Sequence, residues 1–171
     1  MSFVQGDAMA LLYDDNSFDK IICLEVLEWV EDPKKVISEM KRVLKPGGKA
    51  LIGHTDFDTQ IFTTKNLARE RRINQTFCDL GPDGTIGRKL KGMCNKVGFK
   101  KVDYIVYTLT NESFEENNYS YRIAYMMKEW LVKESEVYLE DLEAWIEEMK
   151  DLSSKEEFYY SINRYLTICE K

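Results

Sequence analysis

Residues Gly6 to His54 constrain the fold more than any other part of the chain, because they contain two short apolar runs separated by a helical pattern. Phe18 to Leu24 is rich in β-branched residues and follows a cluster of turn formers, which predicts a strand covered on both faces. Lys49 to His54 is a second short apolar run and predicts a second buried strand. The stretch therefore predicts an α/β fold whose two strands are adjacent and parallel.

The segment between these strands has the signals of an amphipathic helix. Asp32 is suited to be its N-cap, and Pro33 to occupy its first position. Pro46, Gly47 and Gly48 are expected to end it. The apolar residues at helical spacing are Val36, Ile37, Met40, Val43 and Leu44. Their spacing predicts one buried face and one solvated face.

Four segments in this region carry a family resemblance. They are GDA at Gly6–Ala8, DNSFDKII at Asp15–Ile22, EVLEWVEDP at Glu25–Pro33 and RVLKPGG at Arg42–Gly48. In order and spacing they resemble the class I S-adenosylmethionine-dependent methyltransferases, especially the small-molecule branch with the ubiquinone/menaquinone C-methyltransferases. The resemblance is close over the first third of the chain and looser to about Gly98. It implies a Rossmann-like sheet, mostly parallel, with an antiparallel C-terminal strand.

One departure from the family pattern concerns the cofactor site. In the family, a first strand with a glycine-rich turn and an acidic ribose-binding residue precede the GDA segment. The present sequence reaches Gly6 without them. The resemblance therefore implies an N-terminally truncated sheet in which half of the cofactor site is missing.

The remaining segments complete the expected topology. Lys65 to Leu80 and Ile86 to Val97 read as helices, and Ser2 to Gln5 as the stub of a strand. Lys101 to Leu109 and Phe158 to Cys169 read as strands and would form an antiparallel pair at one edge. We expect one domain over residues 1–171, with a helical insertion at about 111–157. A stripe of methionine and aromatic residues in that insertion is more typical of core than of a binding surface.

The resemblance also implies which residues hold S-adenosylmethionine. Asp7, Ala8 and Met9 would contact the adenine, with a carboxylate accepting from the exocyclic amine and a backbone N–H donating to the ring. The backbone near Leu24 would face the methionine part. The alternative is that Gly6-Asp7 is only a turn at the end of a strand.

Polar residues directly after the second predicted strand are the candidates for chemistry. His54 and Asp56 are the expected acid/base residues, because ligands of open α/β sheets bind at the carboxyl ends of strands. Asp58 is expected to orient a substrate or to cap the next segment. A lone histidine at a strand end is nonetheless often structural.

Two further residues are candidates for substrate binding. Trp29 stands where relatives often carry histidine, and its indole would either line the substrate cavity or belong to the core. Arg72, in a run with Arg69 and Arg71, would pair with an anionic substrate or lie on a solvated helix face.

Composition narrows the possible functions. A net charge of −6 argues against non-specific nucleic-acid binding, and no apolar run is long enough to cross a bilayer. We expect a cytoplasmic protein, since the N-terminus has no signal-peptide pattern. The four cysteines have no metal-ligand spacing and are expected to be reduced. The single histidine excludes a metal site with several histidines, so no metal is expected.

These observations lead to two functional hypotheses. The first is methyl transfer to a small-molecule acceptor, with the glycine-rich loop supplied by a longer chain or by a partner. The second is a non-catalytic methyltransferase-like subunit. Either way, we expect a homo-oligomer or a partner chain to complete the sheet, because an unpaired apolar strand edge is a liability.

Overall fold

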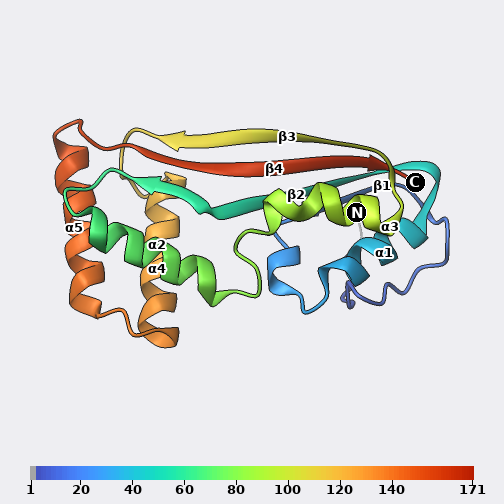
Figure 1. The fold of residues 1–171 in the computed structure, drawn as a ribbon, viewed down its shortest axis with the longest axis horizontal. Coiled ribbons are helices and arrows are strands. Elements are labelled where there is room, and N and C mark those ends of the chain that lie inside the picture. The colour runs from blue at the N-terminus through green and yellow to red at the C-terminus, as the bar shows by residue number, and fades with distance from the viewer. Residues whose placement is uncertain (1–2) are drawn as a thin grey trace. The chain divides into compact units, whose positions relative to one another are not determined.

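The computed structural model describes residues 3–171, and four strands and five α-helices alternate along them (Figure 1). Two short 3-10 helices, η1 and η2, join neighbouring elements. The elements in chain order are β1 (Phe18–Leu24), η1 (Leu27–Trp29), α1 (Pro33–Val43), β2 (Leu44–Phe62), α2 (Leu67–Leu80), η2 (Ile86–Lys89), α3 (Leu90–Val97), β3 (Lys100–Asn111), α4 (Tyr119–Glu134), α5 (Leu139–Ser154) and β4 (Tyr160–Glu170).

The strands form one sheet in the order β1-β2-β4-β3. β1 and β2 are parallel, with Ile22 opposite Leu51 and Leu24 opposite Gly53, so the predicted parallel pair is confirmed. β4 runs antiparallel to β3, as the opposed arrows in Figure 1 show, and the pair lies at one edge as predicted. The predicted mixed α/β fold is therefore confirmed.

By the density of contacts between residues, the chain divides into two compact units. The first contains the described residues up to Thr55, together with Ile86–Val106 and Tyr165–Lys171. The second contains Asp56–Thr85 and Tyr107–Arg164. The single domain expected from the sequence stays a prediction.

In the first unit, α1 and α3 pack against one face of the strands (Figure 1). The Asp32 side chain accepts a hydrogen bond from the Lys35 N–H, and Pro33 begins α1, as predicted. Gly98 ends α3 in the left-handed conformation, with φ of 86°. The buried residues include Val36, Ile37, Met40, Leu44, Ala50, Ile52, Leu90, Cys94 and Cys169. The predicted buried face of α1 is therefore confirmed.

The opposite face of the same strands carries exposed apolar side chains and is called the bare face below. Ile22 and Leu24 of β1 are 68% and 49% exposed, and Ile105 and Ile168 on β3 and β4 are also exposed. The prediction that Phe18 to Leu24 is covered on both faces is therefore wrong for this chain. β1 is an edge strand, and among the described residues helices cover only its Ile21 and Cys23 side.

The N-terminal segment does not extend the sheet. Phe3 to Gln5 are exposed and form no strand, so the predicted strand stub is wrong for these residues, while Ser2 lies outside the described part. One edge of β1 consequently has no neighbouring strand among residues 3–171.

In the second unit, α2, α4 and α5 share one core with the adjoining parts of β2 and β4. Ile73 and Phe77 of α2 are buried, whereas Leu67 is exposed because α2 begins there, after its N-cap Asn66. The largest buried side chains of this core include Met127, Leu131, Leu142, Trp145, Met149 and Tyr160. Most of the methionine and aromatic stripe is core, as predicted, whereas Trp130 is 36% exposed.

None of the helices formed by residues 3–171 is long and apolar enough to cross a membrane.

Removing the α1 cap should destabilise the fold. Asp32→Ala deletes the acceptor for the Lys35 N–H and is expected to lower the free energy of unfolding by about 1 kcal/mol. Urea denaturation followed by circular dichroism measures this. The control is Glu31→Ala, an exposed neighbour, for which we expect a change below about 0.5 kcal/mol. Equal losses for both variants would contradict the assigned cap.

Candidate functional site

His54 and Asp56 lie inside strand β2 and not beyond its end. The sequence placed the end of the strand at His54, but β2 continues to Phe62. Its later part pairs with β4, since the Asn163 N–H donates to Thr59 Oγ1 and the Thr63 N–H to the Tyr159 carbonyl. His54 and Asp56 are buried and Asp58 is exposed. The expectation of a polar run after the strand is thus corrected.

The imidazole of His54 holds the loop that follows β1. Its Nε2 accepts hydrogen bonds from the backbone N–H groups of Val26, at 3.1 Å, and Leu27, at 3.0 Å. A neutral ring that accepts at Nε2 carries its proton on Nδ1. His54 therefore fixes the start of η1 relative to β2, which is a structural role that the sequence analysis had left open.

Two glutamates stand beside this imidazole. Glu28 Oε2 lies 2.8 Å from His54 Nε2, and Glu25 Oε2 lies 4.0 Å from His54 Nδ1. Glu25 also accepts hydrogen bonds from the N–H of Thr55, at 3.2 Å, and from its hydroxyl, at 3.0 Å. One ligand atom from each of the three side chains lies within 4.8 Å of the others. These three side chains form a polar cluster where β1 ends beside β2.

Sequence reasoning selected His54 and missed both glutamates. The available signal was a pair of carboxylates three residues apart, directly after a predicted strand. Glu28 lies in an apolar run that precedes the second strand, so the polar run after that strand did not indicate it. Cys23 also lies near it, and burial together with the Glu28 charge raises the pKa of that thiol to about 11.

The residues assigned to the cofactor meet along the side of β1. Ala8 and Leu24 line an open, mostly apolar cavity of about 430 Å³ in the first unit, with Ile21, Ile22 and Val36 among their neighbours. Asp7 forms a turn beside it, where its Oδ1 accepts from the Met9 N–H at 2.8 Å and its carbonyl from the Ala10 N–H. Met9 packs against the core.

This cavity fits one part of S-adenosylmethionine. Its apolar lining suits the faces of an adenine ring, and an exposed carboxylate stands next to it. The glycine-rich loop that would approach the methionine part is not among the described residues, whose glycines are spread singly apart from Gly47-Gly48.

The segment that carries Asp7 to Met9 is held by α1. Arg42 donates to the carbonyls of Leu11, at 2.9 Å, and Tyr13, at 2.8 Å, and pairs with Asp15. Glu39 accepts from the Leu11 N–H and from Arg42. The hydrogen bonds from Arg42, helped by that from Leu11, lower the pKa of Glu39 from 4.5 to about 2. A largely buried ion pair thus fixes this segment.

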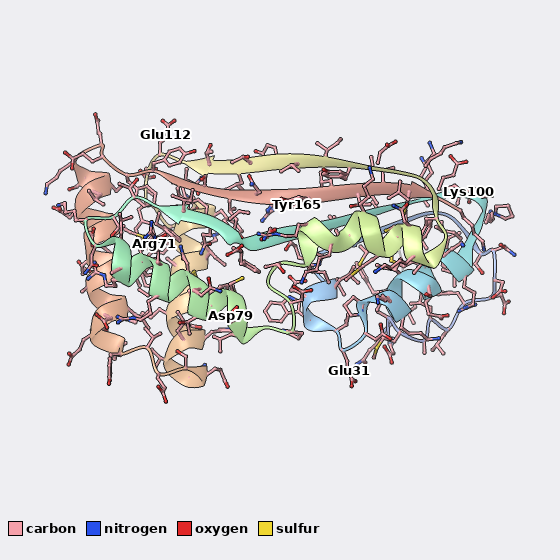
Figure 2. The ribbon with its side chains drawn as sticks, viewed as in Figure 1. Glu31, Arg71, Asp79, Lys100, Glu112 and Tyr165 are labelled. Atoms are coloured by element: carbon pink, nitrogen blue, oxygen red, sulfur yellow. The ribbon has the colours of Figure 1, made fainter. Side chains whose placement is uncertain are left out.

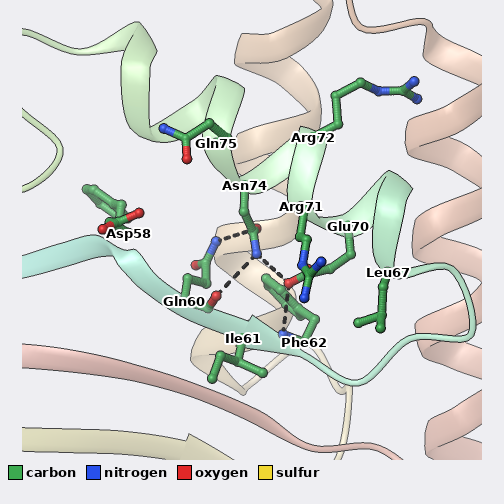
Figure 3. Close-up of a pocket in the computed structure, with 11 residues that line it drawn as sticks. Asp58, Gln60, Ile61, Phe62, Leu67, Glu70, Arg71, Arg72, Asn74 and Gln75 are labelled. Atoms are coloured by element: carbon green, nitrogen blue, oxygen red, sulfur yellow. Dashed lines mark hydrogen bonds between the residues drawn. The ribbon is translucent and has the colours of Figure 1, made fainter.

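The candidate substrate residues lie in different units. Trp29 is 44% exposed at the end of η1 in the first unit, so it is not plain core. Asp58 and Arg72 both line a pocket of about 640 Å³ in the second unit, between β2 and α2 (Figure 3). The guanidinium of Arg72 pairs with Asp141 of α5 at 2.6 Å. Arg69, expected to be exposed, is almost buried against Glu148.

A hydrogen-bond network forms the wall of this second pocket (Figure 3). The Asn74 amide donates to the Gln60 carbonyl, at 3.2 Å, and to Glu70, while the Gln60 amide donates to Asn74 Oδ1. Tyr160 donates to Gln60 Oε1 from β4. Burial raises the pKa of Glu70. Because these groups satisfy one another, the network chiefly fixes α2 on β2.

Comparison with known proteins agrees with the family resemblance seen in the sequence. Residues 1–52 match the family model described as a methyltransferase domain. A demethylmenaquinone methyltransferase from Renibacterium salmoninarum is 44% identical over 59 residues, which are 34% of this chain and 25% of that protein. The ubiquinone/menaquinone biosynthesis C-methyltransferase UbiE from Idiomarina loihiensis is 33% identical over 122 residues, covering 60% of this chain and 47% of that protein. The resemblance to class I small-molecule methyltransferases is confirmed.

A solved structure shows the fold over almost the whole chain. The S-adenosylmethionine-dependent methyltransferase from Thermotoga maritima, described as a possible histamine N-methyltransferase, aligns with a TM-score of 0.52 at 19% identity. The alignment covers 98% of this chain and 63% of that one. The predicted Rossmann-like methyltransferase sheet is confirmed, and the expected cofactor agrees with the family. The chain spans a quarter to about half of the two curated relatives.

Stability should depend on pH through Glu39. The pKa of Glu39 is lowered in the folded state. Its contribution to the free energy of unfolding is therefore complete above about pH 4.5 and is lost as the pH falls toward 2. Between pH 5 and 2 the wild type is expected to lose about 1–2 kcal/mol more unfolding free energy than Glu39→Gln, allowing for solvent screening at Arg42. Urea titrations at several pH values measure this. Parallel pH profiles for the wild type and Glu39→Gln would contradict the stabilising role of the Glu39 carboxylate. Glu31→Gln is the control.

Proposed function

We propose that this chain takes part in S-adenosylmethionine-dependent methyl transfer to a small-molecule acceptor, either within a longer chain or with a partner that supplies the glycine-rich loop. The observation that carries the proposal is the cavity beside β1, because Ala8 and Leu24, which the family resemblance assigns to the cofactor, line it together. The match of residues 1–52 to a methyltransferase domain supports the same conclusion.

The residues of this cavity would take the adenine end of the cofactor. Asp7 would accept a hydrogen bond from the exocyclic amine, while Ala8, Met9 and Leu24 would surround the ring and the adjoining chain. When bound, S-adenosylmethionine supplies an electrophilic methyl group. The contribution of the protein is chiefly to position the acceptor and to exclude water.

Acid/base chemistry in this proposal belongs to His54 and Asp56. Because Nε2 of His54 accepts two backbone hydrogen bonds, His54 could act as a base only if the Val26 and Leu27 N–H groups released that atom. Trp29 would line the acceptor site from η1. Within the second unit, Asp58 and Arg72 would bind a substrate group in the pocket that both line, for which Arg72 would have to give up its pair with Asp141.

The remaining half of the cofactor site would come from a polypeptide that carries the glycine-rich strand and loop, in the same chain or in a partner. The bare apolar face of β1 and its unpaired edge support this, since edge strands and large apolar patches are normally covered. A second copy of the chain would cover the same surface without supplying the loop. We also propose a cytoplasmic location, with which four cysteines outside any disulfide agree.

The competing function is a non-catalytic methyltransferase-like subunit. The lack of a glycine-rich loop in the 171 residues favours it, because that loop carries much of the cofactor site in the resembled family. Cofactor binding in the presence and absence of the glycine-rich half separates the two functions.

The chain alone should bind S-adenosylmethionine weakly. We expect a dissociation constant above roughly 1 mM by calorimetry, falling at least about tenfold when a polypeptide with the glycine-rich half of a relative is added. Asp7→Ala should remove that gain, while Asp14→Ala, an exposed carboxylate in the following loop, should keep it. A low-micromolar constant for the chain alone would overturn the need for a second half. Failure of the mixture to bind would favour the non-catalytic subunit.

The β1 edge should drive association. Sedimentation velocity of the purified chain at micromolar concentration is expected to show a dimer or a larger species. Ile22→Lys places a charge on the bare face and should shift the distribution toward monomer. Leu12→Lys is the matched control, since Leu12 is equally apolar and exposed but lies outside the sheet. A monodisperse wild-type monomer would show that this edge needs no cover.

A further inference from the structure

The outer edge of β3 has no neighbouring strand among residues 3–171, because β3 is the last strand in the order β1-β2-β4-β3. With 12 residues, β3 is long for an edge strand. Its consecutive residues Tyr104, Ile105, Val106 and Tyr107 are between 44% and 58% exposed, so apolar side chains are accessible on both of its faces. We propose that β3 pairs with β3 of a second copy of this chain, antiparallel and about a two-fold axis beside Val106.

The middle of β3 lacks the features that keep edge strands apart. Natural edge strands usually carry a charged side chain, a proline or a bulge, each of which prevents another strand from pairing with them. Between Asp103 and Glu112 the sequence has neither a charged residue nor a proline. Lys101, with φ of 47°, interrupts the extended backbone only near the start of the strand. The exposed backbone of β3 is therefore open to pairing.

The charges at the two ends of β3 favour a second copy as the partner. Lys100 begins the strand and Glu112 follows its last residue, and both are labelled in Figure 2. Lys101 is engaged by Glu170 of β4 at 2.9 Å, whereas within residues 3–171 Lys100 and Glu112 form no ion pair. In an antiparallel pair, Lys100 of each copy comes to the end where Glu112 of the other copy lies. A parallel pair would bring like charges together, so β3 is complementary to itself in one direction only.

Two-fold symmetry also limits the register of the pair. The axis is perpendicular to the sheet, and it sets one residue of β3 opposite the same residue of the other copy, because facing side chains point to the same side. With Val106 at the axis, Lys100 and Glu112 are equally far from it along the chain and come opposite each other. Ile105 then faces Tyr107, and such a pair of a β-branched and an aromatic side chain stabilises a sheet. The charges and the apolar residues thus agree on one register.

This contact is separate from the one proposed at β1. The two strands are the first and the last of the sheet, so one copy of the chain has two different edges. Pairing of β3 with β3 alone closes a dimer, whereas association through both edges gives larger species. A lysine at Ile22 of β1 acts on the other contact only, and the β3 pairing is therefore tested in that variant. The proposal holds whether or not the chain transfers methyl groups.

Disulfide cross-linking tests the register. Val106→Cys is combined with Cys23→Ser, after which the natural cysteines that remain are buried. Facing residues of an antiparallel pair have Cα atoms about 4.5–5.5 Å apart, which a disulfide spans. The matched control is Thr108→Cys on the same face of β3, because the two copies of residue 108 would lie about 14 Å apart along the strands. With diamide as the oxidant, we expect Val106→Cys to form the covalent dimer at least about tenfold faster than Thr108→Cys.

A charge exchange tests the direction of the pair. Sedimentation equilibrium of the Ile22→Lys chain is expected to give a dimer. Adding Lys100→Glu or Glu112→Lys alone places like charges at both ends of the paired strands and should weaken the dimer at least about threefold. The two substitutions together exchange the charges and should restore the dimer. Substitutions that merely harmed folding would not rescue each other in this way.

A lysine in the middle of the strand separates the edge from the face. Val106→Lys should weaken the dimer at least about tenfold, while Ile168→Lys, at a similarly exposed residue of the inner strand β4, should leave it unchanged. The proposal is overturned if the folded Ile22→Lys chain is a monomer at roughly 100 μM, or if Thr108→Cys cross-links as fast as Val106→Cys. It is also overturned if the charge exchange restores nothing, or if Ile168→Lys weakens the dimer equally, since the bare face would then be the contact.

Discussion

The parallel pairing of β1 with β2 is the constraint on which the rest of this structure depends. Its register sets Leu24 opposite Gly53, so the residues that follow β1 lie beside His54 and Thr55 in the middle of β2. Glu25 reaches Thr55 there, and the start of η1 reaches His54. A slip by one residue would turn Ile21 and Cys23 away from the core and would separate these groups. The site is thus a consequence of strand register.

β1 belongs both to the sheet and to the wall of the cavity lined by Ala8 and Leu24. β1 is apolar on both faces, as the sequence suggested, but residues 3–171 cover only one of them. A strand of this composition is suited to the interior of a sheet, not to its edge. The face that carries Ile22 and Leu24 adjoins the cavity lined by Ala8, so whatever covers the strand also covers the cavity proposed to take the cofactor.

Local signals made much of the fold predictable, and long-range pairing limited the rest. Asp32, Pro33 and the apolar spacing after them are determined by neighbours within one helix, and each was placed correctly. The length of β2 was not predictable, because Thr59 and Thr63 are held by β4 about one hundred residues later. The pairing of Arg69 with Glu148 was not predictable either, because these residues are also far apart in the sequence. In the site, His54 could be selected from the sequence, whereas Glu28 comes close to His54 only because η1 forms there.

The position of His54 connects the two parts of the site. Its Nε2 holds the N–H groups of Val26 and Leu27, and Val26 also lines the cavity with Ala8 and Leu24. η1 has no side-chain cap of its own, so these two hydrogen bonds fix where it begins. His54 is therefore connected to the wall of the cavity lined by Ala8 and Leu24 through two backbone hydrogen bonds.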